Sequence, residues 1–96
     1  MLELRPVCEN CAKPLPNESL DAFICSFECT FCQDCVTSVL QNVCPNCGGG
    51  FERRPIRPIE KLRRFPAVIE RRTKPVDLEK FHPLLLSNRD VPPQSR

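Results

Sequence analysis

Two short patterns of apolar residues predict the regular elements in the first half of this chain. A run of valines and leucine is spaced i, i+3, i+4 and i+7, which places the side chains on one face of a helix. These residues are Val36, Val39, Leu40 and Val43. We therefore predict a helix over about residues 33–42, with Asp34 near its start, where a carboxylate suits the helix dipole. Residues 21–25 form a β-like run, and residues 27–31 can supply its hairpin partner.

The pattern changes after Phe51, which is expected to return to the core, and the second half carries seven of the eleven prolines. Residues 53–58 combine arginine, isoleucine and proline and suit extended backbone. Residues 59–65 and 77–86 can each form a short helix, the second interrupted by Pro83. Residues 91–96 are expected to be disordered. The chain thus divides into a head, residues 1–51, and a largely irregular Pro/Arg-rich tail, residues 52–96.

Eight cysteines in four close pairs determine how the head folds. Its apolar residues make a thin core, and a segment of about 50 residues seldom folds on such a core without a metal or disulfide staple. The first residues do not resemble a secretory signal, so we expect a cytoplasmic protein whose thiols stay reduced. Paired cysteines in that compartment indicate two Zn²⁺ sites. A disulfide scaffold and rubredoxin-like iron are the alternatives.

The spacing of the cysteines allows two ways of sharing two metal ions. Sequential pairing would join the first two pairs and the last two pairs. Cross-brace pairing joins the first pair to the third and the second to the fourth, and we favour it because only two residues separate Cys29 from Cys32. Its first site is formed by Cys8, Cys11, Cys32 and Cys35. Its second site is formed by Cys25, Cys29, Cys44 and Cys47.

The cysteine run resembles a RING finger that has cysteine at all eight ligand positions. Residues 29–35, Cys-Thr-Phe-Cys-Gln-Asp-Cys, resemble the central segment of that family, and Cys-Pro-Asn-Cys at 44–47 resembles its final pair. The resemblance implies a small metal-stapled α+β fold, a treble-clef-like, cross-braced ββα zinc finger with two four-cysteine sites. Many RING fingers recruit a ubiquitin-conjugating enzyme.

This chain departs from the recruiting RING fingers at the positions that carry that activity. Asn10 stands where an aliphatic residue is usual, Gly48 stands where a basic residue is frequent, and the chain has no tryptophan. Only Pro45 matches. The resemblance therefore supports the fold and argues against ligase activity.

A longer resemblance covers about residues 8–58. The stretches Cys-Glu-Asn-Cys-x-Lys-Pro-Leu-Pro, Ile-Cys-Ser-Phe-Glu-Cys-Thr-Phe-Cys and Val-Cys-Pro-Asn-Cys-Gly-Gly-Gly-Phe resemble a family of small bacterial proteins of unknown function. This resemblance implies a bacterial cytoplasm and no known substrate.

Charge is distributed unevenly between head and tail. The head has two basic against six acidic residues, a net charge of −4, whereas the tail has twelve basic against six acidic, a net charge of +6. The tail arginines are the candidate contacts for a partner: Arg53, Arg54, Arg57, Arg63, Arg64, Arg71 and Arg72. We expect a protein partner, with nucleic acid as the alternative because arginine neutralises phosphate. A tail that docks on its own acidic head is also consistent with these charges.

No feature of the sequence indicates an enzyme. Four sulfur ligands leave a zinc ion no open position for catalysis. The single histidine, His82, lies outside the cysteine set, and no Ser–His–Asp arrangement or carboxylate pair is recognisable. We therefore predict a non-catalytic binding or adaptor module, with no membrane contact and no evident small-molecule substrate. Ubiquitin-ligase-like activity ranks below nucleic-acid binding.

Overall fold

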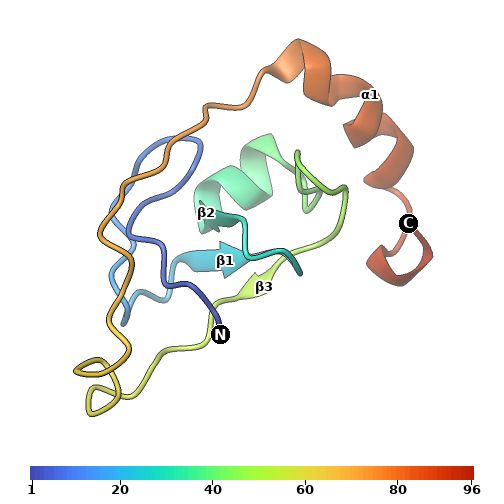
Figure 1. The fold of residues 1–96 in the computed structure, drawn as a ribbon. Coiled ribbons are helices and arrows are strands. Elements are labelled where there is room, and N and C mark those ends of the chain that lie inside the picture. Colours follow the sequence, from blue (N-terminus) through green and yellow to red (C-terminus); the bar gives the residue numbers. More distant parts are fainter.

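The computed structural model describes residues 1–96 and shows a small α+β fold. Its elements are the strands β1 (Ala22–Ile24), β2 (Thr30–Cys32) and β3 (Glu52–Arg53), the π-helical turn η1 (Cys35–Val39), the helix α1 (Leu78–Asn88) and the 3₁₀ turn η2 (Pro93–Ser95). The strands form one antiparallel sheet in the order β2-β1-β3. Figure 1 shows η1 lying above this sheet and α1 lying beyond η1.

The predicted hairpin forms, although its second strand lies slightly later than expected. Phe23 of β1 pairs with Phe31 of β2, and Ile24 pairs with Thr30. The turn between them is closed by a hydrogen bond from the Glu28 amide to the Cys25 carbonyl, 3.0 Å long. Glu28 has a φ of 66° in this turn. No pattern in the sequence predicted β3, whose two residues pair with Phe23 and Ile24.

The predicted helix at about 33–42 forms as a shorter helical segment over residues 33–39, in which Cys35–Val39 have π-type geometry. Its wide hydrogen bond runs from the Leu40 amide to the Cys35 carbonyl, 2.8 Å. Gln41 and Asn42 then adopt positive φ angles of 48° and 60°, which ends the turn. The apolar face was predicted correctly, because Val36, Leu40 and Val43 are all buried.

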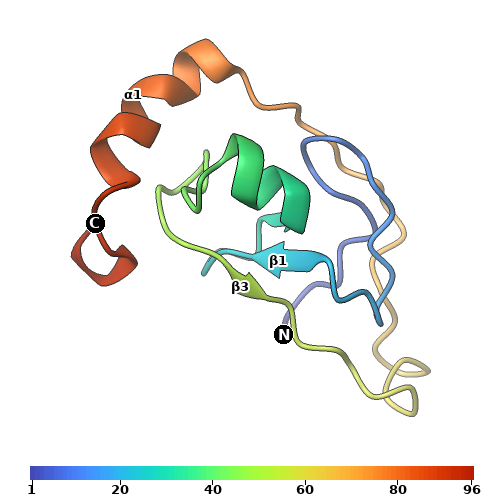
Figure 2. The same cartoon turned by 180° about the vertical axis from the view of Figure 1, so that it is seen from behind.

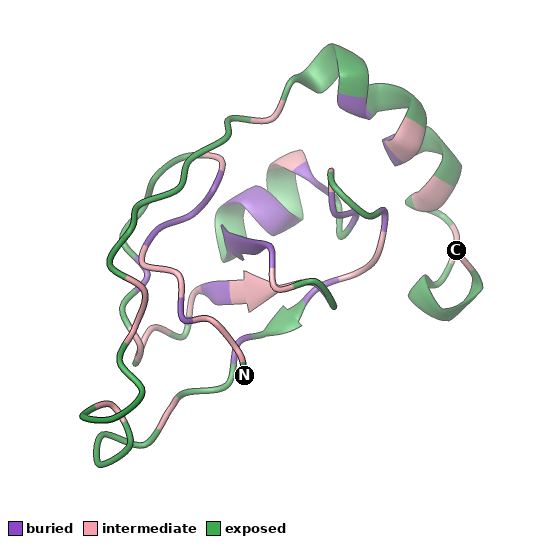
Figure 3. Cartoon of the chain, viewed as in Figure 1, coloured by how far each residue is buried: buried purple, intermediate pink, exposed green.

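The core of the molecule is built largely from cysteine. Six of the eight cysteines belong to its cluster of 15 buried residues. Phe31 and Phe51 pack edge to face within it, with ring centroids 5.5 Å apart. Figure 3 shows buried residues along β2, at the start of β1, on η1 and on α1, whereas β3 is exposed. The expected return of Phe51 to the core is confirmed.

The tail folds back along the head. The Val68 amide donates to the Leu4 carbonyl at 2.9 Å, and the Lys74 amide donates to the Glu9 carbonyl at 2.7 Å. Figures 1 and 2 show this segment running beside the first loop of the head before it enters α1. Phe81 and Leu85 of α1 then complete the core.

The structure corrects two expectations for the predicted helices of the tail. We expected Pro83 to interrupt the second helix, but α1 continues through it. Pro83 has no N–H for the carbonyl of Glu79, and both residues lie on the exposed side, where water can bind that carbonyl. Residues 59–65, expected to be a helix, form successive turns that end before Pro66.

The end of the chain differs from the expected disorder as well. Pro93–Ser95 form η2, and the Arg96 guanidinium donates to the carbonyls of Asn42 and Gly48 at 2.7 and 3.2 Å. These contacts tie the last residues to the head.

No helix of the structure is long and apolar enough to cross a membrane.

Candidate metal centres

The first and third cysteine pairs meet in one cluster. The sulfurs of Cys8, Cys11, Cys32 and Cys35 all lie within 4.8 Å of one another. Cys11 and Cys32 are 3.7 Å apart, sulfur to sulfur. A tetrahedral ion with metal–sulfur bonds of about 2.3 Å requires sulfurs about 3.8 Å apart, so the cluster fits such an ion. We name this group cluster 1.

The second and fourth pairs meet in a less complete cluster, which we name cluster 2. The sulfurs of Cys25, Cys44 and Cys47 lie within 4.8 Å of one another. Cys29, which we predicted as their fourth partner, falls outside that limit. Its carbonyl nevertheless accepts a hydrogen bond from the Cys25 amide at 3.2 Å, and its sulfur accepts one from the Asn46 side chain at 3.4 Å. Cys29 therefore borders cluster 2.

Both clusters have a matching asparagine that sequence analysis did not assign to a metal site. Asn10 of Cys-Glu-Asn-Cys donates its side-chain amide to the Cys35 sulfur at 3.3 Å. Asn46 of Cys-Pro-Asn-Cys donates in the same way to Cys29. In each case, the third residue of a turn bonds a sulfur that comes from the other pair of its cluster. The repeated asparagine was the signal in the sequence that could have revealed this role.

Backbone amides support the sulfurs as well. The Phe27 amide donates to the Cys25 sulfur at 3.3 Å, and the Gly49 amide donates to the Cys47 sulfur at 3.4 Å. Such donors stabilise a thiolate that binds a metal, and they hold it in one orientation.

The two Cys-x-Asn-Cys turns share their backbone geometry. The amide of Ala12 donates to the Cys8 carbonyl at 2.9 Å, and the amide of Gly48 donates to the Cys44 carbonyl at 2.8 Å. Ala12 has a φ of 64° and Gly48 a φ of 78°, a conformation that glycine adopts at least cost. The same closed turn thus presents two sulfurs to each cluster.

Burial disfavours the charged thiolate form of these cysteines unless a bound cation offsets the lost hydration. Loss of solvent raises the pKa values of the Cys29, Cys32, Cys35 and Cys44 thiols above the ordinary value. All eight cysteines are free, and only Cys11 and Cys47 are exposed. A bound cation would favour the thiolate forms, and four sulfurs around it would leave no position for a substrate.

Two of the predicted tail arginines donate hydrogen bonds to carbonyls of the chain itself. Arg54, a predicted contact, is only 2% exposed. Its guanidinium donates to the carbonyls of Arg5, Leu15 and Pro16 at 2.9 to 3.0 Å, and burial lowers its pKa. Arg57 is half-buried and donates to the carbonyls of Leu2 and Phe65, both at 2.7 Å.

The other predicted arginines are exposed. They are Arg53, Arg63, Arg64, Arg71 and Arg72. Arg72 pairs with Glu70 at 3.2 Å, and Arg64 lies over the Phe65 ring, 6.0 Å from its centroid. Most of them lie on the segment 58–72, which we name the basic arm. Its turns at residues 59–65 project at the lower left of Figure 1, and its later residues run back along the head.

Comparison with known proteins places the first half of the chain in one family. Residues 1–57 match the family described as "Protein of unknown function (DUF1272)". An uncharacterized protein of Rhizobium meliloti (strain 1021) is 53% identical over 75 residues, which cover 78% of this chain and 89% of that protein. No solved structure matches the chain. The resemblance to a bacterial eight-cysteine family of unknown function is thereby confirmed.

Proposed function

The chain belongs to the DUF1272 family, and we propose that it is a non-catalytic binding module built on two structural zinc ions. The observation that carries this proposal is the gathering of seven of the eight cysteines into two interleaved clusters, with Cys29 at the border of the second. Zinc suits four thiolates in a closed tetrahedral site, and it would need a reducing compartment such as the cytoplasm. Such ions would hold the head together and take no part in a reaction.

A RING-like cross-brace is the arrangement we propose for the head. Its support is the interleaving, because the first pair meets the third and the second approaches the fourth. The order of two strands followed by a helical turn also agrees with a ββα finger. Cys29 would complete the second site by a small movement toward Cys25, Cys44 and Cys47.

The basic arm is the surface we propose for a protein partner. Ile59 is 81% exposed and Ile69 is 92% exposed, although both are large apolar side chains. Arg63, Arg64 and Arg71 beside them form no ion pair in the structure. Apolar anchors with an arginine rim are characteristic of protein contact sites, where burial of the anchors contributes most of the affinity.

Nucleic-acid binding by the same arm is the second candidate, and the unpaired arginines favour it. Phe65 is the one aromatic side chain on the arm, which offers little base stacking. Ubiquitin-ligase-like activity ranks third, because the Asn10 side chain is already engaged by Cys35 and Val76. A ubiquitin discharge assay tests it directly.

Affinity capture with the zinc-loaded full chain tests the protein-binding proposal. We expect capture of the partner to persist after nuclease treatment and in moderate salt. The double variant Ile59→Ser/Ile69→Ser should no longer capture it. The matched control is Leu20→Ser, a similarly exposed apolar side chain on the head. Loss of capture on nuclease treatment, with steep loss on adding salt, would favour nucleic acid instead. Equal capture by all variants would show that the basic arm is not the contact surface for the partner.

A further inference from the structure

A cavity of about 280 Å³ lies at the seam between the two Cys-x-Asn-Cys turns and α1. Its apolar lining includes Phe31 of β2, Pro45 of the second turn, and Phe81 and Leu84 of α1. The head and the tail thus each provide part of the wall. The volume corresponds to roughly nine water molecules' share of the liquid, which suits a small organic molecule.

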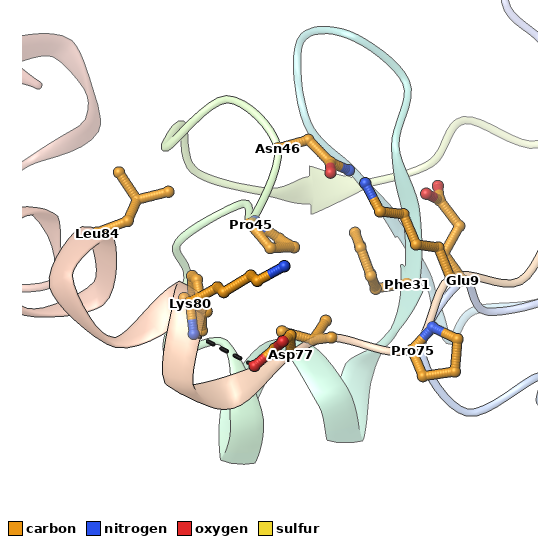
Figure 4. Close-up of a pocket in the computed structure, with 11 residues that line it drawn as sticks. Glu9, Phe31, Pro45, Asn46, Pro75, Asp77, Lys80 and Leu84 are labelled. Carbon is orange, nitrogen blue, oxygen red and sulfur yellow. Dashed lines mark hydrogen bonds between the residues drawn. The ribbon is translucent and has the colours of Figure 1, made fainter.

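Two lysines bring positively charged groups to this cavity, whose lining also holds the carboxylates of Glu9 and Asp77. Lys74 and Lys80 line it, and neither side chain forms an ion pair or a hydrogen bond in the structure. Figure 4 shows the Lys80 side chain extending into the space between Pro45 and Phe31.

The two carboxylates in the lining are already engaged by other groups. Glu9 accepts from the Thr30 amide at 2.6 Å and from the Arg5 guanidinium at 3.0 Å. Asp77 caps α1, and it accepts from the amides of Glu79 and Lys80 at 3.1 and 3.3 Å. Neither carboxylate neutralises the lysine ammonium groups by direct contact, so an arriving ligand can do so.

We propose that this cavity binds a small organic monocarboxylate whose apolar group is flat or branched. The apolar group would rest against Phe31, Pro45 and Phe81, while the carboxylate would pair with Lys74 and Lys80. Ligand pockets commonly combine an apolar lining with a few polar groups that set orientation. This site is separate from the proposed contact surface on the basic arm, so either proposal can fail without the other.

Titration of the zinc-loaded, ¹⁵N-labelled full chain with benzoate tests the proposal. We expect saturable shifts of amides around the cavity, with a Kd on the order of millimolar for so small a ligand. Benzamide has the same shape without the charge, and it should bind roughly tenfold more weakly or not at all. Equal binding of both compounds, or no saturable shift with benzoate, would overturn the proposal.

Lysine variants locate the charge contact. Lys80→Gln and Lys74→Gln should each weaken benzoate binding about fivefold or more, and Lys80→Arg should retain most of it. Lys61→Gln, on the basic arm, is the matched control and should leave the affinity unchanged. A melting temperature equal to that of the wild type identifies variants that fold normally. Equal weakening by Lys61→Gln would show a general charge effect and contradict the assigned site.

Discussion

The side-chain amide of Asn46 lies 3.4 Å from the sulfur of Cys29, the one cysteine outside the tight clusters. This contact joins the last cysteine pair to the second, as Asn10 joins the first to the third through Cys35. Each asparagine therefore links the two halves of one proposed zinc site.

Replacing Asn46 by alanine should weaken zinc binding at cluster 2. Loss of a hydrogen bond to a ligand sulfur typically lowers metal affinity roughly tenfold to a hundredfold. In competition with a chromogenic chelator, one of the two zinc ions should leave the variant at a lower chelator concentration than it leaves the wild type. Gln33→Ala, an exposed residue without a sulfur contact, is the control. Unchanged release of both ions would show that the amide does not support a zinc ligand.

Replacing Gly48 by alanine should loosen α1 from the head. A Cβ atom there would lie 2.6 Å from Asn88 Nδ2 and 3.3 Å from Leu84 Cδ1, and φ is +78°. We expect a loss of about 1–2 kcal/mol in the free energy of unfolding, with faster amide exchange in α1. The control is Gly49→Ala, whose Cβ would meet only the Cys47 sulfur at 3.4 Å. Equal effects of the two variants would contradict the assigned strain.

Arg54 and Arg53 are adjacent but should respond differently to replacement by methionine. Arg54→Met leaves three carbonyls of the head without their donor, so we expect a loss of about 2–4 kcal/mol in the free energy of unfolding. Arg53→Met alters an exposed side chain and should change the free energy of unfolding by under about 0.5 kcal/mol. Chemical denaturation measures both. A small effect of Arg54→Met would mean that its carbonyl contacts contribute little to holding the head together.

The pH dependence of stability should have opposite signs with and without metal. Protons compete with zinc for thiolates, so the loaded head loses stability as pH falls. In a folded metal-free head, burial raises the pKa values of Cys35 and Cys44 above the ordinary 9.0. The free energy of unfolding of the metal-free head would therefore be greatest below pH 9 and would fall as the pH rises above that value. Thermal melts from about pH 5 to 10 check both signs, and alkaline loss in the purified protein would indicate absent metal.

Much of the head could be predicted from the sequence because its signals are local. The hairpin, the buried face of Val36 and Leu40, and the return of Phe51 depend on short-range patterns and cysteine spacing. The interleaved clusters also agree with the favoured cysteine pairing. Cys29 is the exception, since its distance from the other sulfurs depends on how the hairpin turn is set.

The tail could not be predicted as well, because long-range contacts decide its structure. Arg54 looked like one of seven equivalent arginines, and only the folded chain shows that it binds carbonyls of residues 5, 15 and 16. Pro83 looked like a helix breaker, but packing of Phe81 and Leu85 against the core holds α1 together across it. The asparagines of the two turns were visible, yet their sulfur partners lie 25 and 17 residues away.

The number of metal ions in the native protein tests the central proposal most directly. Native mass spectrometry, followed by the same measurement after denaturation, would count bound metal and free thiols together. We predict two zinc ions that are lost on denaturation and eight free thiols. A native protein without metal, and a mass about 8 Da low because four disulfides have formed, would contradict the account.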